Sequence, residues 1–114
     1  MTDIVERFEA MLATGKDSAL LRYSLGVEYS KREDFARAAE HLSASLDADS
    51  EQSAAWKLYG AALRALDDLD AAARAYERGI VVAEQKGDRQ AVKEMTVFLR
   101  RINKQRQPPI SDGG

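Results

Sequence analysis

Residues 54–76, AAWKLYGAALRALDDLDAAARAY, decide the fold of this chain. Gly60 stands in the middle of an apolar helical pattern, and a glycine inside a helix costs about 1 kcal/mol relative to alanine. Such a glycine is useful where a neighbouring helix must pass close to the backbone. Asp67 and Asp68 interrupt the pattern and predict a turn. The segment is therefore predicted to be a hairpin of two helices in close contact.

The same pattern occurs 34 residues earlier in the chain. Gly60 aligns with Gly26, and the turn residues Asp68-Leu69 align with Asp34-Phe35. Further positions of the same kind also align: Leu63 with Tyr29, Ala72 with Ala38, and Tyr76 with Leu42. A period of about 34 residues with one helical hairpin in each copy is typical of stacked helix–turn–helix repeats.

On these residues the chain resembles the tetratricopeptide repeat (TPR) family. One copy reads Leu25-Gly26-x-x-Tyr29 with Ala38-x-x-x-Leu42, and the next reads Trp56-x-x-Tyr59-Gly60 with Ala72-x-x-x-Tyr76. Four positions depart from the family pattern: Arg22 stands in place of a Trp, Gly79 in place of an Ala, and Ser50 and Glu84 in place of the Pro between repeats.

The resemblance implies an all-α fold, a short right-handed α–α superhelix (a TPR-like solenoid) of about six antiparallel helices. We expect helices at about 3–13, 18–31, 35–47, 51–66, 70–85 and 89–104, with Asp49 and Ser50 available to cap the fourth. Residues 1–106 then form a single domain. It comprises a capping half repeat (3–13), two repeats (19–52 and 53–86) and a capping helix (88–105), and we expect 107–114 to be a disordered tail.

Composition limits the possible functions. The chain has 114 residues, no cysteine and a formal charge of −2, which excludes a disulfide scaffold and argues against general attraction to nucleic acid or acidic membranes. The acidic start has no long apolar run, so we expect neither a signal peptide nor a membrane span, and a cytoplasmic location.

No pattern of catalytic or ligand residues can be assembled from the sequence. His41 is the single histidine, without a second imidazole or thiol beside it, and is interpreted as a surface or inter-helix residue. Ser43, Ser45 and Thr96 are interpreted as packing residues. The acids at 67, 68 and 70 suit a turn and a helix N-terminus rather than a calcium loop. We therefore expect no enzyme activity, no cofactor and no metal.

One basic cluster, Arg100-Arg101-x-x-Lys104-x-Arg106, leaves two interpretations open. It could bind an anionic partner or nucleic acid, or it could simply be a solvated last turn that complements the helix C-terminus. Because it stands alone, we do not expect nucleic-acid binding.

In the TPR family, ligand contacts come mainly from the first helix of each repeat, which lines the concave face. Carried over to this chain, the resemblance implies a ligand-binding groove of Tyr23, Val27, Lys31, Lys57, Ala61, Arg64, Lys93, Val97 and Arg100, with Leu20, Ser30, Ala54, Ala65, Gln90 and Arg101 beside them. None of these residues is acidic and six are basic. The groove is therefore expected to favour an acidic segment or a C-terminal carboxylate, unless the basic side chains merely solubilise an exposed face.

The predicted function is a non-enzymatic protein–protein interaction module that binds a peptide or protein segment. The alternative is a structural, homo-oligomerising repeat protein with no separate ligand, because two full repeats are near the lower limit for a stable stack. The chaperone-tail clamp of some family members is not expected, since Tyr23 and Val27 occupy its Lys and Asn positions. Polar end surfaces (Glu6, Arg7 and Glu9; Arg101 and Lys104) predict a monomer or a weak homodimer.

Overall fold

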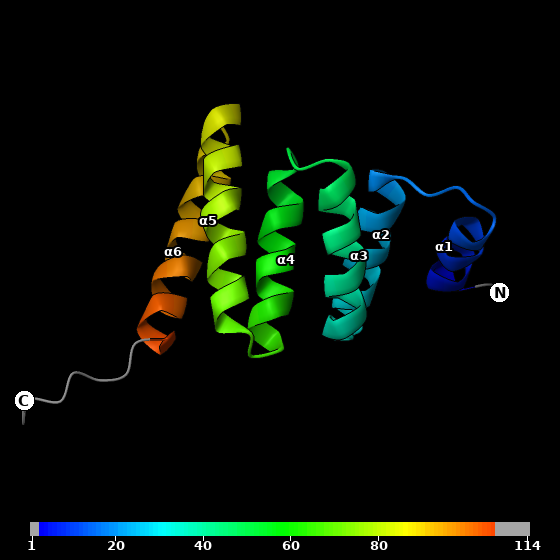
Figure 1. Ribbon diagram of the computed structural model, residues 1–114, viewed down its shortest axis with the longest axis horizontal. Helices are drawn as coiled ribbons and strands as arrows, with labels where there is room; N and C mark the ends of the chain where they lie inside the picture. The colour runs from blue at the N-terminus through cyan, green and yellow to red at the C-terminus, as the bar shows by residue number, and fades with distance from the viewer. Residues whose placement is uncertain (1–2, 107–114) are drawn as a thin grey trace, which may run out of the picture.

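The computed structural model describes residues 3–106, which form six α-helices arranged in a row (Figure 1). The helices are α1 (Ile4–Ala13), α2 (Ala19–Lys31), α3 (Phe35–Ala48), α4 (Ser53–Ala65), α5 (Leu69–Lys86) and α6 (Arg89–Arg106). This confirms the predicted all-α fold of six helices. The predicted tail lies outside the described residues.

The 34-residue repeat is visible in the backbone of the two hairpin turns. Asp34 caps α3 by accepting a hydrogen bond from the Arg37 amide at 3.2 Å, and Asp68 caps α5 in the same way from Ala71 at 3.3 Å. The residue before each aspartate is left-handed, with φ of 59° at Glu33 and 63° at Asp67. The two hairpins therefore turn by the same mechanism.

The start of α4 differs from the prediction. The helix begins at Ser53 after an N-cap at Gln52 that makes no side-chain capping bond. Asp49 accepts instead from the Glu51 amide at 3.0 Å, and the Ser50 carbonyl accepts from the Trp56 indole at 2.8 Å. These bonds shape the linker between the repeats, so neither Asp49 nor Ser50 caps the helix.

The stack is curved, with α2, α4 and α6 on the inner side. Successive helices pack against one another along the chain, and α4 also contacts both α2 and α6. Within residues 3–106, α3 and α5 make no such contact with each other. Since the first helices of the hairpins lie closer together than the second helices, they line the concave face of a body of 60 × 30 × 21 Å.

Small residues allow the close packing. A Cβ atom on Gly60 would lie 2.6 Å from the Tyr76 ring, and one on Gly26 would lie 2.5 Å from Leu42. This confirms the predicted contact of Gly60 with Tyr76. Gly79 explains one departure from the family pattern, because a Cβ there would lie 2.6 Å from both the Met95 sulfur and Trp56.

Two hydrophobic clusters fill the interior. The N-terminal cluster centres on Leu25 and Leu42, and the C-terminal cluster centres on Trp56, Tyr76 and Met95. Tyr23, Ala39 and Tyr59 pack against both clusters and join them. Trp56 and Tyr76 are thus core residues, as predicted.

Candidate functional site

The nine residues expected to form the groove differ in their exposure. Three are half-buried (Tyr23, Val27 and Lys57), and six are exposed (Lys31, Ala61, Arg64, Lys93, Val97 and Arg100). Within residues 3–106 there is no group of three or more potential metal-ligating side chains. Among the same residues, no helix is long and apolar enough to span a membrane.

Two of the basic groove residues have acidic partners. Lys57 on α4 forms an ion pair of 3.2 Å with Glu94 on α6, and Lys31 forms one of 3.0 Å with Glu28. The predicted groove did not include Glu94. Two residues are inserted before α6, so the repeat defines the register of that helix less well than that of α2 or α4. The face therefore does include an acidic side chain, and Lys57 is not a free charge at its centre.

Ala61 and Arg64 meet residues of two other helices in a small pocket. Together with Tyr76 of α5 and with Phe98 and Arg101 of α6, they line a cavity of about 130 Å³. The two arginines of this set, Arg64 and Arg101, have no carboxylate within 4.0 Å among residues 3–106. The pocket therefore combines two cationic side chains with aromatic walls.

Other predicted groove residues lie apart from this pocket. Lys93 lines a separate hollow with Ala83, Glu84 and Val92, where α5 meets the start of α6. Arg100 is adjacent to Arg101 in sequence, so its side chain leaves the helix about 100° away from that of Arg101. Arg101 therefore lines the pocket with Arg64, whereas Lys93 lies in a different hollow.

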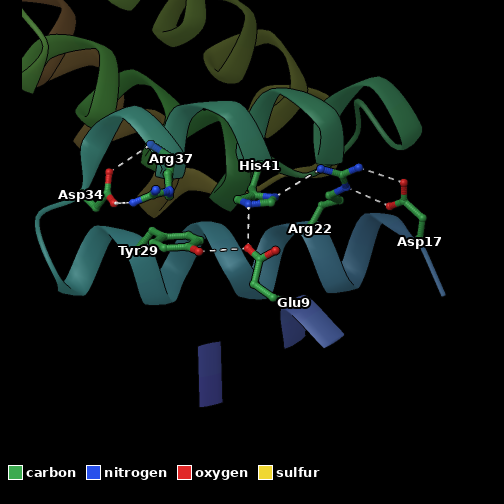
Figure 2. A network of polar contacts seen from close by, with 7 residues as sticks. All are labelled: Glu9, Asp17, Arg22, Tyr29, Asp34, Arg37 and His41. Carbon is green, nitrogen blue, oxygen red and sulfur yellow. Dashed lines mark hydrogen bonds and ion pairs between the residues drawn. The ribbon is translucent and has the colours of Figure 1, made fainter. Parts of the chain in front are cut away.

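A second polar site lies at the other end of the stack, where α1, α2 and α3 meet (Figure 2). His41 is buried between Arg22, whose Nη1 is 3.2 Å from the imidazole Nδ1, and Glu9, whose carboxylate is 3.3 Å from Nε2. The Tyr29 hydroxyl donates to Glu9 at 2.9 Å, and its ring stacks on His41. Of the two positions expected for His41, surface or inter-helix, the structure shows the inter-helix one.

The donors around His41 define its tautomer. Arginine can only donate, so Nδ1 must accept and the imidazole proton resides on Nε2, which faces Glu9. Asp17 holds Arg22 in place with hydrogen bonds of 2.9 and 3.0 Å, and these lower the pKa of the Asp17 carboxyl. Burial, followed by the bond to Glu9, raises the pKa of Tyr29.

This network joins helices rather than presenting reactive groups. Glu9 turns toward α2 and α3, although the sequence had placed it on a polar outer surface. The cluster explains why Arg22 replaces the family's Trp. In the second repeat the equivalent positions hold Trp56 and Ala75, whereas in the first they hold the polar pair Arg22 and His41.

The basic cluster at the end of α6 also has a structural component. Arg106 forms an ion pair of 2.8 Å with Asp70 at the start of α5. The basic residues of this cluster therefore have different surroundings. Arg101 lines the pocket described above, and Arg106 joins α6 to α5 through its ion pair.

A curved stack of antiparallel helical hairpins, with a concave face and no assembled catalytic group in the described residues, defines an α-helical repeat protein of the solenoid class. No family model matches the sequence. However, the chain is 48% identical over 103 residues to TPR repeat-containing protein PA0015 of Pseudomonas aeruginosa, covering 90% of this chain and 98% of that protein. The chain belongs to the tetratricopeptide repeat family.

Solved structures agree with this assignment. The solution structure of protein BPP2914 from Bordetella parapertussis superposes with a TM-score of 0.78 at 47% identity, covering 92% of this chain and 91% of that one. A tetratricopeptide repeat domain protein from Salinibacter ruber shares the fold, with a TM-score of 0.68 at 23% identity over 75% of this chain and 87% of that one. TPR domains are generally protein–protein interaction modules and are typically non-catalytic.

Proposed function

We propose that this protein is a non-enzymatic module that binds an acidic segment of a partner protein on the concave face lined by α2, α4 and α6. The observation that carries the proposal is the presence of two arginines, Arg64 and Arg101, in the same pocket. They come from neighbouring inner helices, line one pocket, and have no carboxylate partner among residues 3–106. Charges of this kind attract an acidic segment and guide its approach.

The centre of recognition is Arg64 rather than Lys57. Lys57 is already compensated by Glu94, so an incoming carboxylate must compete with an existing ion pair there. Toward α2 the face becomes less charged, because Tyr23 and Val27 present half-buried apolar surface. A segment with acidic residues at one end and an apolar residue at the other would fit this gradient.

A charge-reversal experiment tests the proposal. The double variant Arg64→Glu plus Arg101→Glu should abolish binding of a fluorescein-labelled hexaglutamate peptide, measured by anisotropy, and leave the thermal melting curve nearly unchanged. Binding by the parent should weaken as salt rises, since the Debye length is about 8 Å at physiological ionic strength.

The matched control reverses two arginines elsewhere. Arg7 on α1 and Arg74 on α5 are exposed, and neither lines the pocket. The control variant Arg7→Glu plus Arg74→Glu carries the same change in net charge, so it should retain binding. Loss of binding in the control, with retention in the Arg64 and Arg101 variant, would place the working surface outside the concave face.

A second candidate function, self-association, is favoured by one observation at the N-terminal end. Ile4 and Met11 on α1 are 43% and 40% exposed, and Leu20 at the start of α2 is 73% exposed. Ile4 and Met11 are seven residues apart, two helical turns, so they share a face. If this face joins two copies, light scattering should show a dimer that Met11→Glu converts to monomer.

A further inference from the structure

Tyr76 occupies an unusual position for a core tyrosine. Its ring crosses the backbone of α4 at Gly60, where three ring atoms would lie 2.6–2.9 Å from a Cβ atom, and Tyr76 also lines the pocket on the concave face. The equivalent pair in the first repeat is Gly26 with Leu42, which has no polar atom to bring through. In the second repeat the gap at Gly60 therefore lets a polar side chain of an outer helix reach the inner face.

The Tyr76 side chain is largely buried, and its hydroxyl has no hydrogen-bond partner within residues 3–106. The hydroxyl oxygen itself is not fully buried, since the one fully buried side-chain polar atom without a partner in that region is Ser30 Oγ. The residue is 2% exposed, and no bond of its hydroxyl occurs among the side-chain hydrogen bonds of that region. Burial raises the pKa of Tyr76 to about 12, while nearby Arg64 acts in the opposite direction. At neutral pH the phenol is protonated, so it has a proton to donate.

The rest of the pocket defines what could accept that proton. Arg64 and Arg101 supply positive charge, and Phe98 lies against Tyr76 with ring centroids 5.6 Å apart. The cavity of about 130 Å³ has room for one small chemical group and is too small for a drug-sized ligand. A hydroxyl donor that shares a pocket with two arginines is suited to a small oxyanion, because charge-assisted hydrogen bonds are the strong ones.

We propose that this pocket binds a single carboxylate, with the Tyr76 hydroxyl donating one hydrogen bond and Arg64 and Arg101 supplying the charge. The inference rests on the proposed function and names the subsite in which the partner's acidic segment is anchored. The carboxylate could belong to an acidic side chain or to a chain terminus, and both would meet the same donors.

Amide NMR titrations with short peptides can distinguish these sources. The probes are an acetylated tetra-alanine with a free carboxyl terminus, an amidated alanine peptide with one central glutamate, and the same peptide with glutamine instead. We expect one or both carboxylate peptides to shift the amides of Arg64, Tyr76 and Arg101 in a saturable way, and the glutamine peptide to leave them unmoved. Inorganic phosphate bound more tightly than either carboxylate peptide would overturn the proposal.

Tyr76→Phe tests the donor directly, because it removes one oxygen and keeps the ring. It should weaken binding of the responding carboxylate peptide by about tenfold, the effect of one hydrogen bond to a charged group, while the thermal melting curve is retained. Arg101→Gln should also weaken binding, whereas the control Arg74→Gln, at an exposed arginine of α5 that does not line the pocket, should not. Unchanged affinity in Tyr76→Phe would overturn the carboxylate pocket.

The outcome also separates this inference from the proposed function. If hexaglutamate binds and depends on Arg64, but Tyr76→Phe binds every carboxylate probe as the parent does, the pocket inference is wrong and the acidic groove stands. If neither hexaglutamate nor the short carboxylate peptides bind the parent, both are wrong.

Discussion

At the scale of single residues, the two repeats differ most in what lies against their central glycines. Gly26 accommodates Leu42, which completes an apolar contact, and Gly60 accommodates Tyr76, which reaches toward the concave face. The central glycine therefore accommodates an apolar side chain in one repeat and, in the next, a tyrosine that also lines the pocket. If the proposed carboxylate pocket is correct, the two copies differ in function through one residue of an outer helix, Leu42 in the first and Tyr76 in the second.

Gly60→Leu should destabilise the protein. Overpacking costs about 1–3 kcal/mol, and it exceeds the gain of nearly 1 kcal/mol from the better helix propensity of leucine. The cost should be near the upper end, because the Tyr76 ring is fixed by Phe98 and cannot easily withdraw. Urea denaturation monitored by circular dichroism measures the change.

Ala65→Leu is the control for this prediction, because Ala65 ends the same helix and is exposed. That variant should unfold close to the parent. A Gly60→Leu protein more stable than the parent would show that the gap at Gly60 is not closed by Tyr76 in solution.

At the scale of elements, α1 is held differently from the other helices. Val5 is its one buried residue, and Phe8 and Leu12 pack half-buried against the N-terminal cluster. Polar contacts add to these, through Glu9 to Tyr29 and His41 and through Asp3 to Arg32 at the end of α2. The hydrogen bond from Arg32 is the largest influence on the Asp3 carboxyl and lowers its pKa below the ordinary value of 3.8. The docking of α1 should therefore depend on pH.

Asp3→Asn tests this dependence. A lowered folded-state pKa contributes stability that is present above the unfolded value near 3.8 and is lost as pH falls through the lower folded value. Asparagine still caps the helix but cannot pair with Arg32 as a charge. The variant should open α1 more easily than the parent at pH 7, and the difference should shrink as the pH falls below 3.8.

The chemical shifts of α1 amides, followed by NMR from pH 7 to pH 2, measure the population of docked helix in both proteins. Glu6→Gln is the control, because Glu6 is exposed in the first turn of the same helix and has no ion pair among residues 3–106. A difference between Asp3→Asn and the parent that persists at pH 2 would mean that the charge pair does not hold α1.

The sequence predicted the helices well because the 34-residue period places each glycine and each turn aspartate independently. It also placed Ala61 and Arg64, one and four residues after Gly60, in the same predicted groove, and both line the pocket. It missed Tyr76 as a pocket residue, because an apolar pattern shows that a tyrosine is buried but not where its hydroxyl emerges. Glu94 and the Glu9–His41–Arg22 network were missed because their contacts join helices in ways that the repeat does not specify.

At the scale of the whole molecule, the two hydrophobic clusters behave as one cooperative unit only if something connects them. In a repeat protein each unit contacts its neighbours, so the coupling between units decides whether unfolding is all-or-none. Tyr23, Ala39 and Tyr59 provide the connection here, because they pack against both clusters. Tyr59 is the clearest case, since it lies on α4, the helix of the second hairpin that packs against α3, and its ring centroid is 6.3 Å from that of Trp56.

Two probes of unfolding can measure this coupling. Trp56 is the single tryptophan and lies in the C-terminal cluster, so its fluorescence reports on that cluster, whereas far-UV circular dichroism reports on all six helices. In the parent the two denaturation midpoints should coincide. Tyr59→Ala removes the bridging ring and should separate them, with a total loss of about 3 kcal/mol or less because the ring is only half-buried.

Ile80→Ala is the matched control, because Ile80 is also half-buried but packs against the C-terminal cluster and not against the N-terminal one. Its midpoint should fall with both probes together, since it weakens one cluster and leaves the connection intact. Coincident midpoints in Tyr59→Ala would show that the coupling is carried elsewhere, through Tyr23 and Ala39. Separated midpoints in the parent itself would show that the curved stack consists of two units that unfold independently, and the concave face would then join two bodies rather than one.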